Sequence, residues 1–288
     1  MTMAAAPAAA AFPWLFVLLW STGFVGAKLG LPHAEPLSFL LVRYLLVVGL
    51  MAVLALATRA PWPRDPRQWL HIGVAGLLVH ATYLGGVFIA ISLRLPAGVA
   101  SLVVGLQPLL AAFGAAIWLG ERVGPRQWAG LLLGLVGTAL VVGGKLGSDF
   151  GPDALAAAVI ALFGITIGTL YQKRYCRAFD WRSGAVLQFL PTALVTAIVV
   201  FAGGGIRIDW VGEFVFALGW LVIVLSLGAI SLLNHLIRSG TAVNVASLFY
   251  LVPPCTALMA WAAFGETLSG GALAGMALAI WGVYWART

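Results

Sequence analysis

Long apolar stretches separated by short polar loops form the dominant pattern of this chain. A helix needs about 20 apolar residues to cross a bilayer. Ten stretches approach or exceed that length, at residues 12–30, 36–58, 69–91, 97–119, 126–144, 154–175, 181–203, 211–236, 241–264 and 270–286. The loops are short and rich in proline and glycine, which leaves no room for a soluble domain. The pattern predicts an all-α polytopic membrane protein with ten transmembrane helices.

The same pattern repeats after half of the chain. A shift of 145 residues places Pro108 on Pro253 and Ala97 on Ala242. It also superposes Gly23 on Gly168, Lys28 on Lys173, Tyr44 on Phe189, Gly120-Glu121 on Gly265-Glu266, Ala129-Gly130 on Ala274-Gly275, and Gly137 on Gly282. A shared period of this length indicates a duplicated unit. We therefore predict two units of five helices, residues 1–145 and residues 152–288.

An odd number of spans per unit means that the second unit inserts upside down relative to the first. Inverted repeats related by an axis in the membrane plane are typical of secondary transporters, which bind substrate near the midplane. We therefore expect two inverted five-helix repeats. Some duplicated channels share this plan, so the repeat favours a transporter without excluding a channel.

Composition and charge agree with a membrane protein. The 288 residues are 62% hydrophobic and only 9% charged, whereas soluble domains carry about 25% charged residues. The net charge of +7 comes from bases in short loops, so it indicates topology and not nucleic-acid binding. Eleven Lys and Arg residues fall on the side of both termini and five on the other. This bias predicts cytoplasmic termini in a cell inner membrane, and the uncharged N-terminus predicts that the first span is retained.

Several segments together resemble one family. They are Trp20–Lys28, Leu41–Tyr44, Ala100-Ser101 leading to Pro108, Gly120–Arg122 with Gln127–Gly130, and, in the second half, Ala246-Ser247 leading to Pro253, Gly265–Thr267 and Ala274-Gly275. They resemble the two EamA domains of the ten-span branch of the drug/metabolite transporter superfamily, over nearly the whole chain. Within that branch the chain is similar to the YddG-type amino-acid exporters. The resemblance implies a central cavity between spans one to four and six to nine, with spans five and ten at the periphery.

Prolines interrupt two apolar stretches at corresponding places. Pro108 lies near the middle of the fourth span, and Pro253 and Pro254 lie near the middle of the ninth. Proline removes a backbone donor and frees a carbonyl one turn earlier. In lipid such a carbonyl needs a partner or a wet cavity. A kink for packing alone is the plainer alternative, but paired breaks at the midplane favour a transport site.

The ionisable residue Arg43 lies about seven residues inside the second span. A charge at this depth is costly and suggests a function, because a guanidinium can hold a substrate carboxylate through two hydrogen bonds. It could equally gate the outer mouth, reach the outer interface, or pair with carbonyls at a helix end.

Other polar and aromatic side chains fall near the same depth. We expect His80, Tyr83 and Gln107 to orient polar groups of a substrate, and Trp20 and Tyr250 to contact its side chain. A histidine on a helix face is often a packing residue, although at mid-bilayer it needs a partner or water. A central tryptophan could likewise only fill space between helices.

All nine acidic residues lie in or beside loops, so no carboxylate is expected at mid-membrane. A cation antiporter would be expected to use one as the shared site for proton and substrate. We therefore expect facilitated diffusion, with proton coupling through His80 left open. Cys176 and Cys255 show neither disulfide nor metal spacing, so no cofactor or metal is expected.

These observations predict an exporter of small amphipathic metabolites, above all amino acids, including aromatic ones, and not an enzyme. Its partners would be the small-molecule substrate and membrane lipid. Nucleosides, sugar phosphates or drugs are alternative cargoes. A membrane-embedded hydrolase is a weaker alternative, because His80 has no carboxylate beside it in the sequence pattern. Small residues at Gly130 and Gly134, and at Gly271 and Gly275, fit packing within the chain or a homodimer.

Overall fold

The computed structural model describes residues 7–95, 97–143, 150–176, 178–264 and 268–287. These residues form a helical bundle, in which one isolated bridge joins Ala34 to Ile208. The elements are α1 (Pro7–Gly30), the 3-10 turn η1 (Leu31–His33), α2 (Pro36–Ala57), α3 (Pro66–Gly76), the π-helix η2 (Leu77–Leu84), α4 (Gly85–Ser92), α5 (Ala97–Val104), α6 (Gln107–Gly114), the π-helix η3 (Ala115–Leu119), α7 (Pro125–Gly143), α8 (Pro152–Tyr175), α9 (Trp181–Ala202), α10 (Gly212–Trp220), the π-helix η4 (Leu221–Ala229), α11 (Ile230–Ser239), α12 (Ala242–Ser247), the 3-10 turn η5 (Leu248–Leu251), α13 (Val252–Phe264) and α14 (Gly270–Arg287). The predicted turn Gly265-Glu266 and Lys145 lie outside the described residues.

Eight helical stretches of the described chain are long and apolar enough to cross a membrane. They are Ala11–His33, Pro36–Ala57, Pro66–Ser92, Val99–Leu119, Pro152–Tyr175, Trp181–Ala202, Gly212–Ser239 and Ala242–Met259. Large apolar side chains such as Val53 (67% exposed) and Ile198 (71% exposed) face outward, as expected of a surface that meets lipid chains. The predicted fifth and tenth spans are the helices α7 and α14, which are not among the eight. The total of ten spans therefore stays a prediction.

The α-helix is interrupted in the two spans that contain Pro108 and Pro253-Pro254. Between α5 and α6 the residues Gly105 and Leu106 leave the α-helix, just before Pro108 in the first turn of α6. Between α12 and α13 the chain tightens into η5, just before Pro253 and Pro254. Proline starts a helix without cost because the first amides have no helical partner in any case. Each break thus divides one span into two shorter helices.

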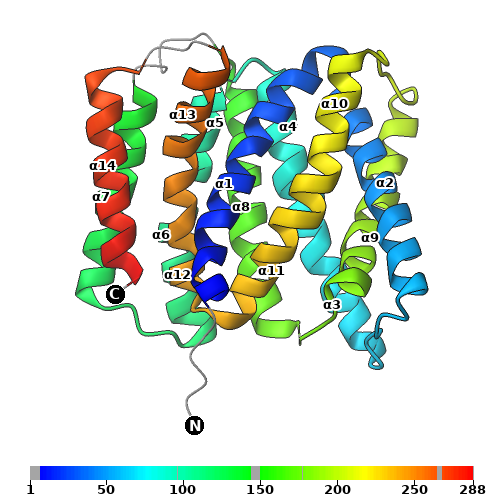
Figure 1. Ribbon diagram of the computed structural model, residues 1–288, viewed down its shortest axis with the longest axis horizontal. Coiled ribbons are helices and arrows are strands. Elements are labelled where there is room, and N and C mark those ends of the chain that lie inside the picture. The colour runs from blue at the N-terminus through cyan, green and yellow to red at the C-terminus, as the bar shows by residue number, and fades with distance from the viewer. Residues whose placement is uncertain (1–6, 96, 144–149, 177, 265–267, 288) are drawn as a thin grey trace.

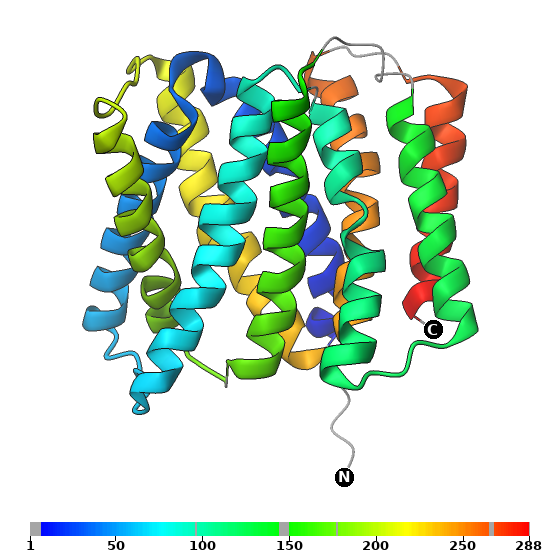
Figure 2. The same cartoon turned by 180° about the vertical axis from the view of Figure 1, so that it is seen from behind.

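The boundaries of two pairs of corresponding helices differ by the same number of residues. Helix α1 and helix α8 are 145 residues apart at both ends, as are α2 and α9. The π-helices η2 and η4 likewise nearly coincide after that shift. In Figures 1 and 2, α1 runs up from the edge where the described chain begins and ends, whereas α8 runs down towards it.

Helices α7 and α14 stand as a pair at one edge of the bundle (Figure 1). Glycine allows this close approach: a Cβ on Gly137 would lie 2.4 Å from the backbone nitrogen of Ala279 and 2.6 Å from the oxygen of Gly275. Gly130 meets Ala286 in the same way. Small residues let helix backbones approach in lipid. The predicted small residues of α7 therefore pack within one chain, and the homodimer stays a prediction.

Acidic residues in the loops fix the starts of several helices. The carboxylate of Glu35 accepts from the amide of Ser38, that of Asp65 from Arg67, and that of Asp180 from Arg182. Each capped helix begins with amides that lack an intrahelical partner. These three acids stabilise helix ends at the rim of the bundle, away from its centre.

Candidate functional site

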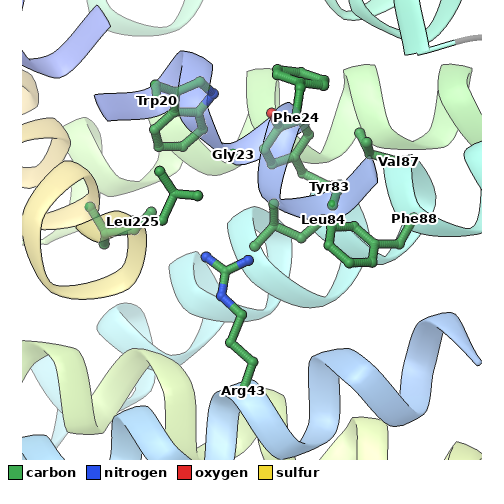
Figure 3. A pocket seen from close by; sticks show the side chains of 11 residues that line it. Trp20, Gly23, Phe24, Arg43, Tyr83, Leu84, Val87, Phe88 and Leu225 are labelled. Atoms are coloured by element: carbon green, nitrogen blue, oxygen red, sulfur yellow. The ribbon is translucent and has the colours of Figure 1, made fainter. Parts of the chain in front are cut away.

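A small cavity lies between the two halves of the bundle, bounded by α1, α2, η2, α4 and η4. Its wall includes Trp20, Phe24, Arg43, Tyr83 and Phe88 (Figure 3). It holds about 40 Å³, which is room for a few water molecules because one needs at least about 10–15 Å³. A metabolite would fit only after helices or side chains move apart. We call this space the outer cavity, since it lies in the half of the bundle away from the chain ends.

Arg43 enters the outer cavity from α2. Its side chain is 2% exposed, and its Nε donates to Ser226 Oγ at 3.0 Å. The Ser226 hydroxyl in turn donates to the backbone oxygen of Leu221 at 3.1 Å, so its oxygen is left to accept from the arginine. Figure 3 shows the guanidinium pointing into the space between Trp20 and Leu84. Within the described chain no carboxylate pairs with it.

Aromatic rings form the apolar part of the cavity wall. Trp20 lies almost parallel to Tyr83, with ring centroids 6.2 Å apart and an interplanar angle of 14°. It also meets Phe249 edge to face at 5.4 Å and Phe16 in a tilted contact at 5.2 Å. Such rings offer flat apolar surfaces on which other rings can pack, and their electron-rich faces attract cations. The arrangement suits a ligand that is partly apolar and carries a carboxylate.

A second space, the central pocket, joins the two broken helices. It is lined by Trp20, Tyr83, Gly105, Phe249 and Pro253, among others. The Ser21 hydroxyl donates to the backbone oxygen of Val17 at 2.7 Å, and the oxygen of Val252 at this break lies 3.3 Å from it as a second acceptor. Pro108 and Pro254 are buried beside the breaks but do not line this pocket. Of the predicted hinge residues, Pro253 alone lies in the wall of a described pocket.

Two predicted site residues lie away from both spaces. The ring of His80 stacks on Phe189 at 4.0 Å, and its backbone oxygen accepts from Tyr44 Oη at 2.8 Å. Neither ring nitrogen has a partner at hydrogen-bonding geometry. Tyr250 turns towards α7, where its ring occupies the position that a Cβ on Gly134 would need.

Gln107 lies in a third space, here called the inner pocket. This pocket is lined by Gln107, Thr169, Lys173, Ile237, Ala242, Val245, Ala246 and Phe249. Gln107 is 1% exposed, and its Oε1 has no hydrogen-bond partner. The structure therefore gathers Trp20, Arg43 and Tyr83 around one cavity and places Gln107 beyond Phe249.

Sequence reasoning missed Phe24, Ser226, Phe249 and Lys173. A single hydroxyl in an apolar span, such as that of Ser226, can be satisfied by its own helix and so carries no signal. The position of Lys173 after the sixth span resembles any base at a membrane boundary. Only the packing of distant helices shows what these side chains contact.

The sequence matches the EamA-like transporter family over residues 9–143 and again over residues 153–288. The chain belongs to this family. The match confirms the predicted resemblance and makes the protein a multi-pass membrane transporter of the drug/metabolite transporter superfamily. Within the residues that the structure describes, no group of three His, Cys, Asp or Glu side chains could hold a metal ion.

Several known proteins are similar to this chain over most of their length. A probable amino-acid metabolite efflux pump of Salmonella typhimurium is 28% identical over 282 residues, which cover 94% of this chain and 91% of that protein. The uncharacterized transporter YvbV of Bacillus subtilis is 27% identical over 275 residues, covering 92% and 86%. One protein crystal structure shares 25% identity and a TM-score of 0.77, covering 96% of this chain and 94% of that chain.

Proposed function

We propose that this EamA transporter exports small amphipathic metabolites, in the first place amino acids, from the cytoplasm by alternating access. The observation that carries the proposal is Arg43, a buried guanidinium that points into an aromatic-walled cavity and has no acidic partner in the described chain. A charge buried without a counter-ion is costly. A substrate carboxylate would neutralise it through two parallel hydrogen bonds.

The remaining wall suits the rest of an amino acid. Trp20, Phe24 and Tyr83 offer apolar ring surfaces to a variable side chain. The same rings can attract an ammonium group through their faces. The relative in Salmonella that is named a probable amino-acid metabolite efflux pump supports this choice of cargo. His80 and Tyr250 would then support the walls from behind and not contact the substrate.

The proposed mechanism uses two inverted units, residues 1–145 and 152–288, that rock about the central pocket. The constant shift between corresponding helices and the opposite directions of α1 and α8 support this arrangement. Both broken spans contribute to the central pocket, as expected of a midplane site. Both termini would lie in the cytoplasm, with α7 and α14 completing ten spans.

Transport would run down the substrate gradient without proton coupling and without chemical conversion of the cargo. Seven of the nine acidic residues are described, and none of them lines the outer cavity, the central pocket or the inner pocket. Flux of a neutral amino acid into proteoliposomes should therefore not change when a pH gradient is imposed. Accumulation above equilibrium that collapses with the gradient would contradict uniport.

Counterflow in proteoliposomes, with amino acids, nucleosides, sugar phosphates and quaternary amines as cargoes, tests the proposal. The wild-type protein should exchange amino acids, and Arg43→Met should raise the KM for them by about 10-fold or more, since hydrogen bonds to charged groups contribute about 1.5–3 kcal/mol. Arg64→Met, which removes a charge from a loop, is the matched control and should leave KM unchanged. Exchange of amino acids by Arg43→Met at wild-type KM would refute the role of Arg43.

A further inference from the structure

The inner pocket holds an unused acceptor and a cation at the cytoplasmic end of the bundle. Gln107, at the start of α6, is 1% exposed, and its Oε1 has no hydrogen-bond partner. Lys173, near the end of α8, lines the same pocket. A buried acceptor without a donor costs free energy unless a ligand or water satisfies it. An ammonium group is the donor that such an oxygen would favour most.

Lys173 is held by groups that a substrate could partly replace. Its Nζ donates to the backbone oxygens of Gly240 and, at 3.4 Å, Ile237, and it lies 3.5 Å from Glu121 Oε1. Glu121 has a closer partner of its own, because its two oxygens accept from the amide of Ala242 at 2.9 and 3.1 Å. If Glu121 loses its contact with Lys173, its carboxylate still accepts from the amide at the start of α12, where the helix dipole favours a negative charge.

We propose that the inner pocket, which holds about 10 Å³ here and widens when helices or side chains move apart, is a second binding site for an amino-acid zwitterion, entered from the cytoplasm. The substrate carboxylate would displace Glu121 from Lys173, and the substrate ammonium would donate to Gln107 Oε1. This inference rests on the proposed function, since it gives the same cargo a place to bind before it reaches Arg43. The exchange of one carboxylate for another keeps Lys173 paired throughout.

The pocket linings connect this site to the outer cavity. Phe249 lines both the inner and the central pocket, and Trp20 lines both the central pocket and the outer cavity. The two rings touch edge to face, so they separate Lys173 from Arg43 by a thin aromatic barrier. A zwitterion would thus find one cation on each side of the barrier, Lys173 before it and Arg43 beyond it.

A purely structural role for Lys173 makes a different prediction. Its contacts with Gly240 and Ile237 lie at the end of α11, while Glu121 caps α12, so the pair could simply clamp the turn between these helices. Loss of a clamp would affect every cargo and both faces of the membrane alike. Loss of a binding site would affect the cytoplasmic face and the zwitterion selectively.

The experiment measures KM from each face in sided proteoliposomes for phenylalanine, for its decarboxylated amine and for its deaminated acid. Lys173→Met should raise the cytoplasmic KM for phenylalanine and the acid at least tenfold, with little change for the amine. Gln107→Leu should raise the cytoplasmic KM at least tenfold for phenylalanine and the amine, with little change for the acid. The KM measured from the outer face should stay within twofold of wild type. The ratio of maximal rate to KM must remain the same for both directions of transport, because a uniporter creates no gradient, so the maximal rates should change to keep it equal.

Three further variants make the result decisive. Lys173→Arg should restore most of the affinity for phenylalanine, and Glu121→Gln should lower the cytoplasmic KM by removing the competing carboxylate. Arg182→Met also removes a base from the same end of the bundle, where Arg182 pairs with Asp180 at 2.8 Å, and should have no effect on KM.

Equal loss of affinity for all three cargoes at both faces would overturn the proposal in favour of a clamp. Gln107→Leu does not touch that clamp, so normal cytoplasmic KM values in this variant would overturn the proposal by themselves. If the wild-type protein moves no amino acid at all, the proposed function itself fails.

Discussion

At the scale of single residues, the buried polar groups near the cavity depend on partners from distant parts of the chain. Arg43 and Ser226 are 183 residues apart, and both are almost fully buried. The hydroxyl fixes Nε and leaves the two terminal nitrogens of the guanidinium facing the cavity. Ser226 is therefore a positioning residue for the proposed carboxylate site.

Replacement of Ser226 by alanine should weaken substrate binding without blocking transport. The change leaves Arg43 Nε buried and unpaired, and a hydrogen bond to a charged group contributes about 1.5–3 kcal/mol. We expect the KM for amino acids from the outer face to rise about 10-fold, since 1.4 kcal/mol is about tenfold in affinity. The maximal counterflow rate should change less than twofold.

Two variants serve as controls for this prediction. Ser226→Thr keeps the hydroxyl and should restore most of the affinity. Ser231→Ala removes a hydroxyl from the same continuous helix, at a residue that lines none of the described pockets, and should behave as wild type. A normal KM in Ser226→Ala would show that Arg43 does not need this partner.

At the scale of helices, the pair α7 and α14 shows how glycine sets the distance between backbones. Gly137 and Gly275 each face the other's backbone so closely that an added Cβ would lie 2.6 Å and 2.5 Å from the partner's oxygen. Lipid offers no hydrophobic driving force between helices, so such contacts stabilise by dispersion over many atoms. The sequence pattern predicts small residues here, and the structure shows which neighbour they meet.

A methyl group at this contact should therefore destabilise the protein. Gly137→Ala forces the backbones apart, and overpacking typically costs about 1–3 kcal/mol. Gly49→Ala is the matched control, because nothing lies within 4 Å of a Cβ at that exposed position in α2. It should be neutral or stabilise by about 0.5–1 kcal/mol. Thermal unfolding in detergent would compare the two variants, and equal melting temperatures would contradict the tight contact.

The cap of α9 gives an element-scale prediction that depends on pH. The hydrogen bond from the Arg182 side chain, with amides of the first turn, lowers the pKa of Asp180 below its ordinary value of 3.8. Because the folded pKa is depressed, the carboxylate stabilises the fold above the unfolded pKa. That contribution is lost as the pH falls through the folded value.

Two substitutions separate the cap from the charge. Asp180→Ala should lower stability by about 0.5–2 kcal/mol at neutral pH, the usual cost of losing an N-cap. Asp180→Asn keeps an acceptor and should cost less. The difference between wild type and Asp180→Asn should shrink as the pH is lowered below 3.8, the ordinary pKa of the group. A difference that stays constant with pH in thermal unfolding would contradict the role of the charge.

At the scale of the whole molecule, the inverted arrangement requires that α7 and α14 cross the membrane. The residues Arg122 and Asp153 flank α7 and are exposed. In a protein whose Cys176 and Cys255 are replaced, Asp153→Cys should react with a membrane-impermeant thiol reagent in intact cells. Arg122→Cys and Arg287→Cys should react only in inverted vesicles. Labelling of Arg122→Cys and Asp153→Cys from the same side would contradict ten spans.

The amino-acid sequence by itself determined the class, the repeat and the breaks of this protein. Apolar runs of membrane length, a 145-residue period and prolines at Pro108 and Pro253 are local or periodic properties, so they can be found without coordinates. The charge bias predicts an orientation for the same reason. The depth of Arg43 within its span could also be predicted, because its neighbours in the chain are apolar, but its burial could not, since a long side chain at that depth can equally reach the outer interface.

Only the tertiary structure decided which polar residues share a cavity. His80 and Tyr83 are three residues apart, yet the first packs on Phe189 and the second on Trp20. Both residues lie in η2, and a π-helix turns less per residue than an α-helix, so their side chains point further apart than they would in an α-helix. Gln107 and Lys173 line one pocket because α6 packs beside α8, and that packing depends on how the helices of both units fit together. Side-chain packing between elements distant in sequence is a property of the whole bundle, and no local pattern encodes it.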